Sequence, residues 1–137
     1  MAYTKSGKTY HCPVEAALDV IGGKWKPLIL WILRNGALRY SAIQRAIPEV
    51  NSKTLTRQLR ELEEDGVISR TQFPEIPPRV EYSVTTFGRS LLPIIQSLCD
   101  WGAQYLGTEC QAKNEEIAPV VPVQPPDEKV GADDAVW

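Results

Sequence analysis

Apolar residues recur at helical spacing in three segments of the first 50 residues. A helix is predicted over 12–21, because Pro13 suits the first turn of a helix and Gly22 suits the end of one. The segment 24–35 is apolar on all sides, which is typical of a helix in the middle of a core. A shorter helix is predicted over 39–47. These three helices would supply much of the core.

The segment 52–65 has a clear helical pattern. Its inward stripe consists of Leu55, Leu59 and Leu62. Ser52 is a good N-cap and Gly66 is a good C-terminal stop, so a helix of about three to four turns is expected. Because the turn around Pro48 joins it to the preceding short helix, the two are expected to form a helix-turn-helix.

Two β-strands are predicted after this helix, over 67–71 and 80–84, the second with strict alternation. The segment between them, 73–79, contains three prolines, which lack the backbone donors that a ladder or a helix needs. We therefore expect a hairpin with a stiff, projecting tip.

A long final helix is predicted from Thr85, its N-cap, to Leu106, with Gly107 as its end and a bend at Pro93. Its apolar stripe consists of Leu91, Ile94, Ile95, Leu98, Trp101 and Tyr105. Such a broad apolar face exceeds what one small core needs, so a partner chain is expected to cover it. The predicted fold is mainly α with a small β-hairpin wing (α+β): a winged helix-turn-helix with N- and C-terminal dimerisation helices.

Composition divides the 137 residues into one domain and two tails. Residues 1–11 are expected to be a flexible arm, 12–107 the folded domain, and 112–137 a disordered tail rich in proline and acidic residues. The net charge of −2 hides an asymmetry, because 1–113 carry 14 basic and 11 acidic residues while the rest carry one and six. The apolar runs are too short to cross a membrane and no secretory signal is seen, so we expect a cytoplasmic protein.

The outward face of the predicted helix 52–65 is basic, whereas the acidic residues gather at its C-terminal end. Basic groups are disfavoured at a helix N-terminus, and an approaching phosphate or guanine edge would offset that cost. A merely solvated surface is the alternative interpretation. The candidate DNA contacts, including two arginines beside the hairpin tip, are Ser52, Lys53, Thr54, Thr56, Arg57, Arg60, Arg70 and Arg79. The expected partner is double-stranded DNA.

Two other classes of protein are less well supported. An enzyme is not expected, because His11 is the only histidine and no nucleophile elbow or phosphate-binding glycine loop is present. A winged helix that binds protein would present an apolar or mixed face where this one is basic. No metal site and no cofactor are predicted, because one histidine and three scattered cysteines provide no chelating spacing.

Several strings stand in unbroken order along the chain: CPVE at 12–15, DVIGGKWK at 19–26, YS at 40–41, KTLT at 53–56, LRELEEDGVI at 59–68, and YSVT at 82–85 with Gly88. Together they resemble the HxlR-type branch of the MarR-like transcriptional regulators. The resemblance covers Cys12 to Gly107 and implies a homodimer whose winged helices bind a palindromic operator, acting as a repressor or activator. A repressor is the expectation here. Several members sense oxidants through an N-terminal cysteine, and Cys12 stands at that position.

The three cysteines, Cys12, Cys99 and Cys110, are candidates for redox sensing. Cys12 stands at the N-terminus of a predicted helix, where the backbone N–H groups of the first turn would stabilise its thiolate. On one straight helix Cys99 and Cys110 would lie ~16 Å apart, too far to bond, so pairing would require Cys12 of the same chain or of the other chain. The alternatives are cysteines with a purely structural role and a regulator that responds to a small-molecule effector.

Overall fold

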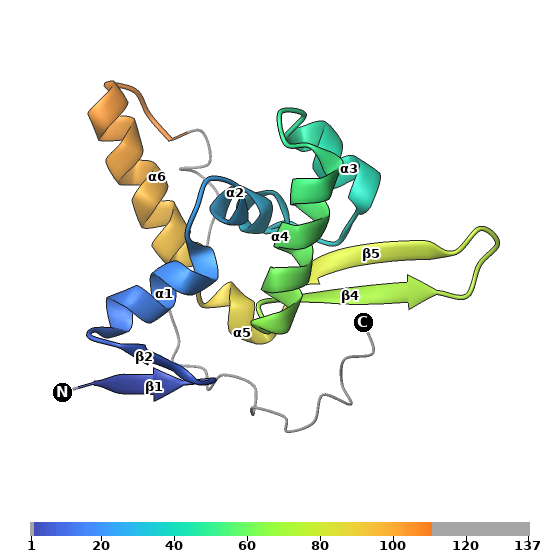
Figure 1. Cartoon of the computed structure of the whole chain (residues 1–137). Coiled ribbons are helices and arrows are strands. Elements are labelled where there is room, and N and C mark those ends of the chain that lie inside the picture. The colour runs from blue at the N-terminus through green and yellow to red at the C-terminus, as the bar shows by residue number, and fades with distance from the viewer. Residues whose placement is uncertain (1, 111–137) are drawn as a thin grey trace.

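The computed structural model describes residues 2–110 (Figure 1). The helices are α1 (Pro13–Ile21), α2 (Trp25–Ile32), α3 (Tyr40–Ala46), α4 (Ser52–Glu64), α5 (Thr86–Arg89) and α6 (Leu92–Leu106). The strands are β1 (Tyr3–Lys5), β2 (Lys8–Tyr10), β3 (Leu38–Arg39), β4 (Ile68–Phe73) and β5 (Arg79–Val84). This order confirms the predicted winged helix-turn-helix, a mainly α fold with a small β-hairpin wing.

Helix α2 lies at the centre, as its all-round apolar pattern predicts. It contacts α1, α3, α4 and α6. The side chains that are almost completely buried are Ile29, Leu30, Leu33, Ile43, Leu55, Leu59, Leu62 and Val67. Burying side chains of this size contributes about 1.5–3 kcal/mol each, so the contact between α2 and α4 is a main source of stability. The predicted leucine stripe of α4 is confirmed.

The wing is an antiparallel hairpin in a three-stranded sheet of order β3-β5-β4. The register runs from Ile68 opposite Val84 to Phe73 opposite Arg79. The two predicted strands are confirmed, and the projecting tip extends away from the helices (Figure 1). The two-residue strand β3 was not predicted, because Leu38 and Arg39 are too few to show alternation.

The cap of α4 lies one residue earlier than the sequence predicts. The side chain of Asn51 accepts a hydrogen bond from the backbone N–H of Thr54, with an N···O distance of 2.8 Å. Ser52 is therefore the first residue of the helix and not its N-cap. Asparagine and serine are comparable caps, so composition alone does not choose between neighbours.

The predicted continuous helix from Thr85 to Leu106 is wrong. Thr85 caps α5, accepting from the backbone of Gly88 at 2.9 Å, but α5 ends after one turn. Helix α6 begins separately, and Pro93 occupies its first turn, where the missing N–H costs nothing. No bend at Pro93 is therefore needed. The predicted end at Gly107 is confirmed, with a φ of +75°.

Residues 3–10 form a hairpin, which corrects the predicted flexible arm. Strands β1 and β2 pair around Ser6 and Gly7, whose φ angles of 53° and 78° suit a tight hairpin turn. The hydroxyl of Tyr10 donates to Asp19 of α1 at 2.8 Å. This hydrogen bond lowers the pKa of Asp19 and raises the pKa of Tyr10. The hairpin is thus attached to α1.

The predicted acidic tail, 112–137, lies outside the described residues, and its disorder stays a prediction. Within residues 2–110, no helix is both long enough and apolar enough to cross a membrane.

Candidate nucleic-acid interface

The first nine residues of α4 form a polar, basic surface. Its exposed side chains line a shallow hollow and are Ser52, Lys53, Thr56, Arg57 and Arg60. Thr54 is half-buried, and its backbone N–H donates to the side chain of the cap residue Asn51. The structure thus brings five of the six predicted α4 residues onto one accessible face. The positive end of the helix dipole adds to the charge of these side chains.

Tyr40 joins α3 to this face, a role that the sequence analysis missed. Its hydroxyl donates to the backbone carbonyl of Ser52 at 3.1 Å and lies 3.4 Å from the hydroxyl of Thr56. The contact fixes the angle between the two helices at the end where the basic residues lie. The only sequence signal was the Tyr40-Ser41 pair at the start of α3.

An ion pair inside the fold also positions α4. The ammonium group of Lys26 lies 2.9 Å from the carboxylate of Glu61, and the Lys26 side chain is buried. The Glu61 side chain is 41% exposed, but removing it would leave the buried ammonium group of Lys26 without this partner, which is costly. The contact therefore holds α4 against the central helix. The signal available in the sequence was a lysine in a helix that is otherwise apolar.

The C-terminal half of α4 carries acidic residues, as predicted. Glu63 is buried, and burial raises its pKa, while the positive charges of Arg70 and Arg60 oppose that rise. Burial likewise raises the pKa of Asp65. The negative charge at this end leaves only the N-terminal half of α4 suited to a polyanion.

The two wing arginines have different surroundings. Arg79 is held on the wing by carboxylates at 3.1 Å and 3.5 Å, those of Glu75 and Glu81. Its guanidinium also lies 4.0 Å from the centre of the Phe73 ring. Arg70 is exposed and pairs across the strands with Tyr82, nearer the base of the wing than its tip. Contrary to the prediction, the two arginines do not flank the tip together.

The predicted interface stripe on α6 is divided. Ile95 belongs to the core of its own chain and is 5% exposed, and Leu91 packs against that core. The other four side chains face outward and are Ile94, Leu98, Trp101 and Tyr105. Val14 and Leu18 of α1 are exposed as well. Both helices lie at the end of the molecule opposite the wing (Figure 1).

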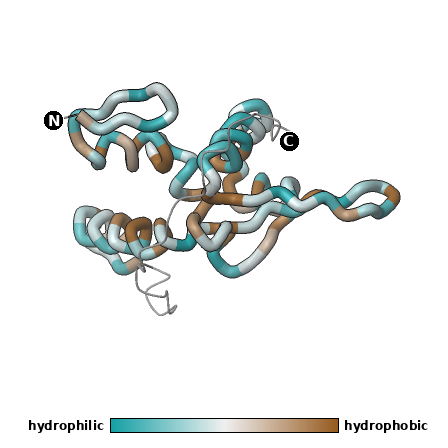
Figure 2. Tube along the Cα trace, turned by 90° about the horizontal axis from the view of Figure 1, so that it is seen from below, coloured by the Kyte–Doolittle hydropathy of each residue, from teal (hydrophilic) through white to brown (hydrophobic). Residues whose placement is uncertain are grey.

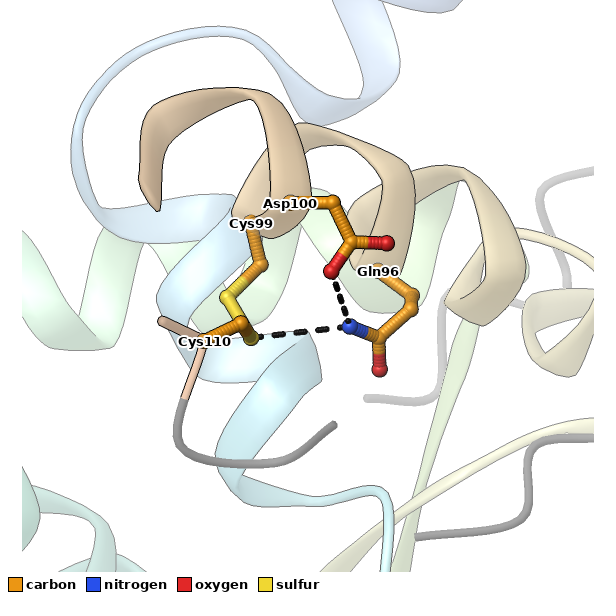
Figure 3. Close-up of a disulfide and its surroundings, with 4 residues drawn as sticks. All are labelled: Gln96, Cys99, Asp100 and Cys110. Carbon is orange, nitrogen blue, oxygen red and sulfur yellow. Dashed lines mark hydrogen bonds between the residues drawn. A yellow bond between two sulfur atoms is a disulfide. The ribbon is translucent and has the colours of Figure 1, made fainter. Parts of the chain in front are cut away.

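The structure corrects the predicted cysteine chemistry. Cys99 and Cys110 form a disulfide within one chain, with their Cα atoms 5.9 Å apart (Figure 3). The straight-helix estimate fails because α6 ends at Gly107, whose left-handed conformation turns the chain back. Cys110 is buried, and Cys12 is a free, exposed thiol.

The disulfide lies against the middle of the molecule. Cys110 packs with Ala103, Trp31 and Cys99, and the side-chain amide of Gln96 lies 3.5 Å from its sulfur (Figure 3). A cavity of about 670 Å³ adjoins it between the C-terminal ends of α2 and α6. Within residues 2–110, histidine, cysteine and acidic side chains form no group of three that could hold a metal ion.

Comparison with known proteins agrees with this geometry. A family model described as HxlR-like helix-turn-helix matches residues 20–110. The chain belongs to this family. An HTH-type transcriptional regulator of Methanothermobacter thermautotrophicus is 53% identical to it over 96 residues, which are 70% of this chain and 73% of the relative. This HxlR-type chain is a transcriptional regulator and not an enzyme.

Two solved structures share the fold of this HxlR-type regulator. The HTH-type transcriptional regulator YtcD is 49% identical with a TM-score of 0.67, over 70% of this chain and 98% of that one. The redox regulator HypR in its oxidized form is 46% identical with a TM-score of 0.66, over 68% of this chain and 96% of that one.

Proposed function

We propose that this HxlR-type regulator is a homodimeric repressor that binds a palindromic operator in double-stranded DNA. Each α4 enters a major groove by its N-terminal half. The observation that carries the proposal is the exposed row Lys53, Arg57 and Arg60, beside Ser52 and Thr56. Arginine and lysine recognise guanine edges and phosphates, and the acidic end of α4 stays away from the DNA.

The exposed apolar side chains of α1 and α6 support the dimer. Leu98 is 55% exposed and Trp101 66% exposed, while the rings of Trp101 and Tyr105 stack at 5.6 Å. Exposed apolar groups of this size are typical of a surface covered by a partner. A two-fold dimer would present two copies of α4 to two half-sites of the operator.

The Arg57→Ala variant is expected to bind the operator about 5- to 150-fold more weakly, because a base-reading arginine contributes about 1–3 kcal/mol. Fluorescence anisotropy on DNA from the upstream region of the chain's own gene measures the change. Discrimination between operator and unrelated DNA should fall as well. Removing a contact to phosphate alone would weaken both DNAs equally.

Arg89→Ala is the matched control, since Arg89 is exposed on α5 beyond the acidic end of α4. It should leave operator affinity unchanged. Wild-type binding should weaken steeply with salt, as phosphate contacts require. Weak salt dependence, or an Arg57→Ala variant with wild-type affinity, would contradict the proposal and favour a winged helix that binds protein.

A second proposal is thiol control of this regulator through Cys99 and Cys110. The disulfide fixes the turn after α6 against Trp31 of α2. Helix α6 also carries the exposed rings of Trp101 and Tyr105. Resemblance to HypR, a redox regulator, favours such control. A dithiol reductant would break the S–S bond by exchange, giving two cysteine thiols and an oxidised reductant; diamide would take up the two protons and two electrons in the reverse direction.

Reduction of the wild type by dithiothreitol is expected to weaken operator binding about fivefold or more, a coupling within the usual range for allostery. Cys99→Ser and Cys110→Ser variants should bind like the reduced wild type under all conditions. Cys12→Ser should keep the response. A response lost only in Cys12→Ser would assign the sensing to that exposed thiol, and a wild type without any response would leave small-molecule effectors as the remaining inducers.

A further inference from the structure

The tip of the wing is apolar and accessible. Its exposed residues are Pro74, Glu75, Ile76, Pro77 and Pro78, and the Ile76 side chain is completely exposed. Figure 2 shows hydrophobic colour at the outer end of the wing, far from the core. Three prolines restrict the backbone on both sides of Ile76. A rigid loop therefore holds one large aliphatic side chain in solvent.

The charges of the tip are already paired with each other. Arg79 lies within 3.1 Å of Glu75 and 3.5 Å of Glu81, and it stacks on Phe73. Extending this arginine toward a phosphate would break both ion pairs and leave two carboxylates facing a polyanion. The tip is thus better suited to a contact through Ile76 than to one through Arg79.

The tip is connected to the basic face of α4 through the start of α3. One hollow is lined by the tip residues 75–80 together with Arg39, Tyr40 and Ser41. Tyr40 in turn bonds to Ser52 at the first turn of α4. A duplex that receives α4 in its major groove would therefore lie next to the tip, with exposed Arg39 between the two.

We propose that Ile76 inserts into the minor groove of the operator beside each half-site and selects A·T over G·C pairs there. This inference rests on the proposed DNA-binding function. The minor groove is about 6 Å wide, which admits a side chain but not a two-stranded ribbon. An apolar side chain against the groove floor would leave the amino group of guanine without water, whereas A·T pairs lack that group. Arg39 would bind phosphate at the edge of the groove.

The test uses the full chain and operator duplexes that differ only in the pairs flanking the half-sites. Replacing flanking A·T pairs by G·C should weaken wild-type binding about tenfold, or 1.4 kcal/mol. Replacing them by inosine·C should have little effect, because inosine lacks the minor-groove amino group. Ile76→Ser should weaken binding to the A·T duplex about tenfold and bind all three duplexes equally.

Two further variants separate this contact from charge effects. Ile76→Leu should retain the discrimination between A·T and G·C flanks. Arg39→Ala should also retain this discrimination, but its salt slope should fall by about one phosphate contact. Ile76→Ser should leave the salt slope and the thermal unfolding unchanged, since the side chain is exposed. Equal wild-type affinity for G·C and inosine·C flanks, or an Ile76→Ser variant that binds like the wild type, would overturn this inference but leave the proposed function intact. A wild type that binds no DNA specifically would overturn the proposed function as well.

Discussion

A Leu98→Asp variant is expected to be monomeric and to bind the operator at least about 100-fold more weakly than the wild type. Leu98 is 55% exposed in the middle of the outward face of α6, between Ile94 and Trp101. In a dimer, aspartate at this site would be a buried, unpaired charge, which costs several kcal/mol. A monomer places one α4 on one half-site, so the gain from binding two half-sites together is lost.

Light scattering measures the mass, and anisotropy with full and half operators measures the affinity. Gln104→Asp is the matched control, because Gln104 is exposed on the same helix about a quarter turn from that face. It introduces the same charge and should stay dimeric. Leu98→Asp should also keep the wild-type helix content, since its site lies outside the core. A Leu98→Asp dimer with wild-type affinity would show that α6 does not form the interface.

Local sequence signals predicted the helices and the wing because each signal acts within a few residues. The stripe of Leu55, Leu59 and Leu62 determines the buried side of α4, and the alternation over 80–84 determines β5. The cap shift from Ser52 to Asn51 changes one residue and leaves the exposed face as predicted. Periodicity therefore sufficed to place the basic row on the surface.

The parts that sequence reasoning missed depend on contacts between segments. The hairpin at 3–10 has little apolar content, and it is attached through Tyr10 and Asp19, a pair that no local pattern reveals. The disulfide depends on the reversal at Gly107, and a straight-helix distance does not apply past a left-handed residue. Periodicity shows on which face of a helix a residue lies, but it does not show the direction of the chain beyond the end of the helix.

The candidate site shows a second limit. Counting cations assigned Arg79 to DNA, but Glu75 in the tip and Glu81 on the same strand both form ion pairs with Arg79. Neighbouring charges decide which cation is available, and the sequence gives no distances between them. The fold also leaves Ile76 exposed at the tip, where composition alone would favour burial.

Gly88→Ala is expected to lower the free energy of unfolding by about 3 kcal/mol, the upper part of the usual range for overpacking. A Cβ added at Gly88 would lie 2.0 Å from the carbonyl oxygen of Val67 and 2.8 Å from its carbon. That oxygen also accepts a hydrogen bond from the backbone N–H of Thr85 at 3.0 Å. Relieving the clash must move backbone at the junction of α4, the wing and α5, so no side-chain rotation can absorb it.

Urea unfolding at a fixed protein concentration measures the change, because a dimer's stability depends on concentration. Gly102→Ala is the control, since a Cβ at this α6 position would meet no atom within 4 Å. It should stabilise the protein by up to about 1 kcal/mol through helix propensity. Gly88→Ala should reduce operator binding only as far as the folded fraction falls, because the basic row of α4 lies at the other end of that helix. A Gly88→Ala variant as stable as the wild type would show that the contact between α5 and Val67 is looser than the structure has it.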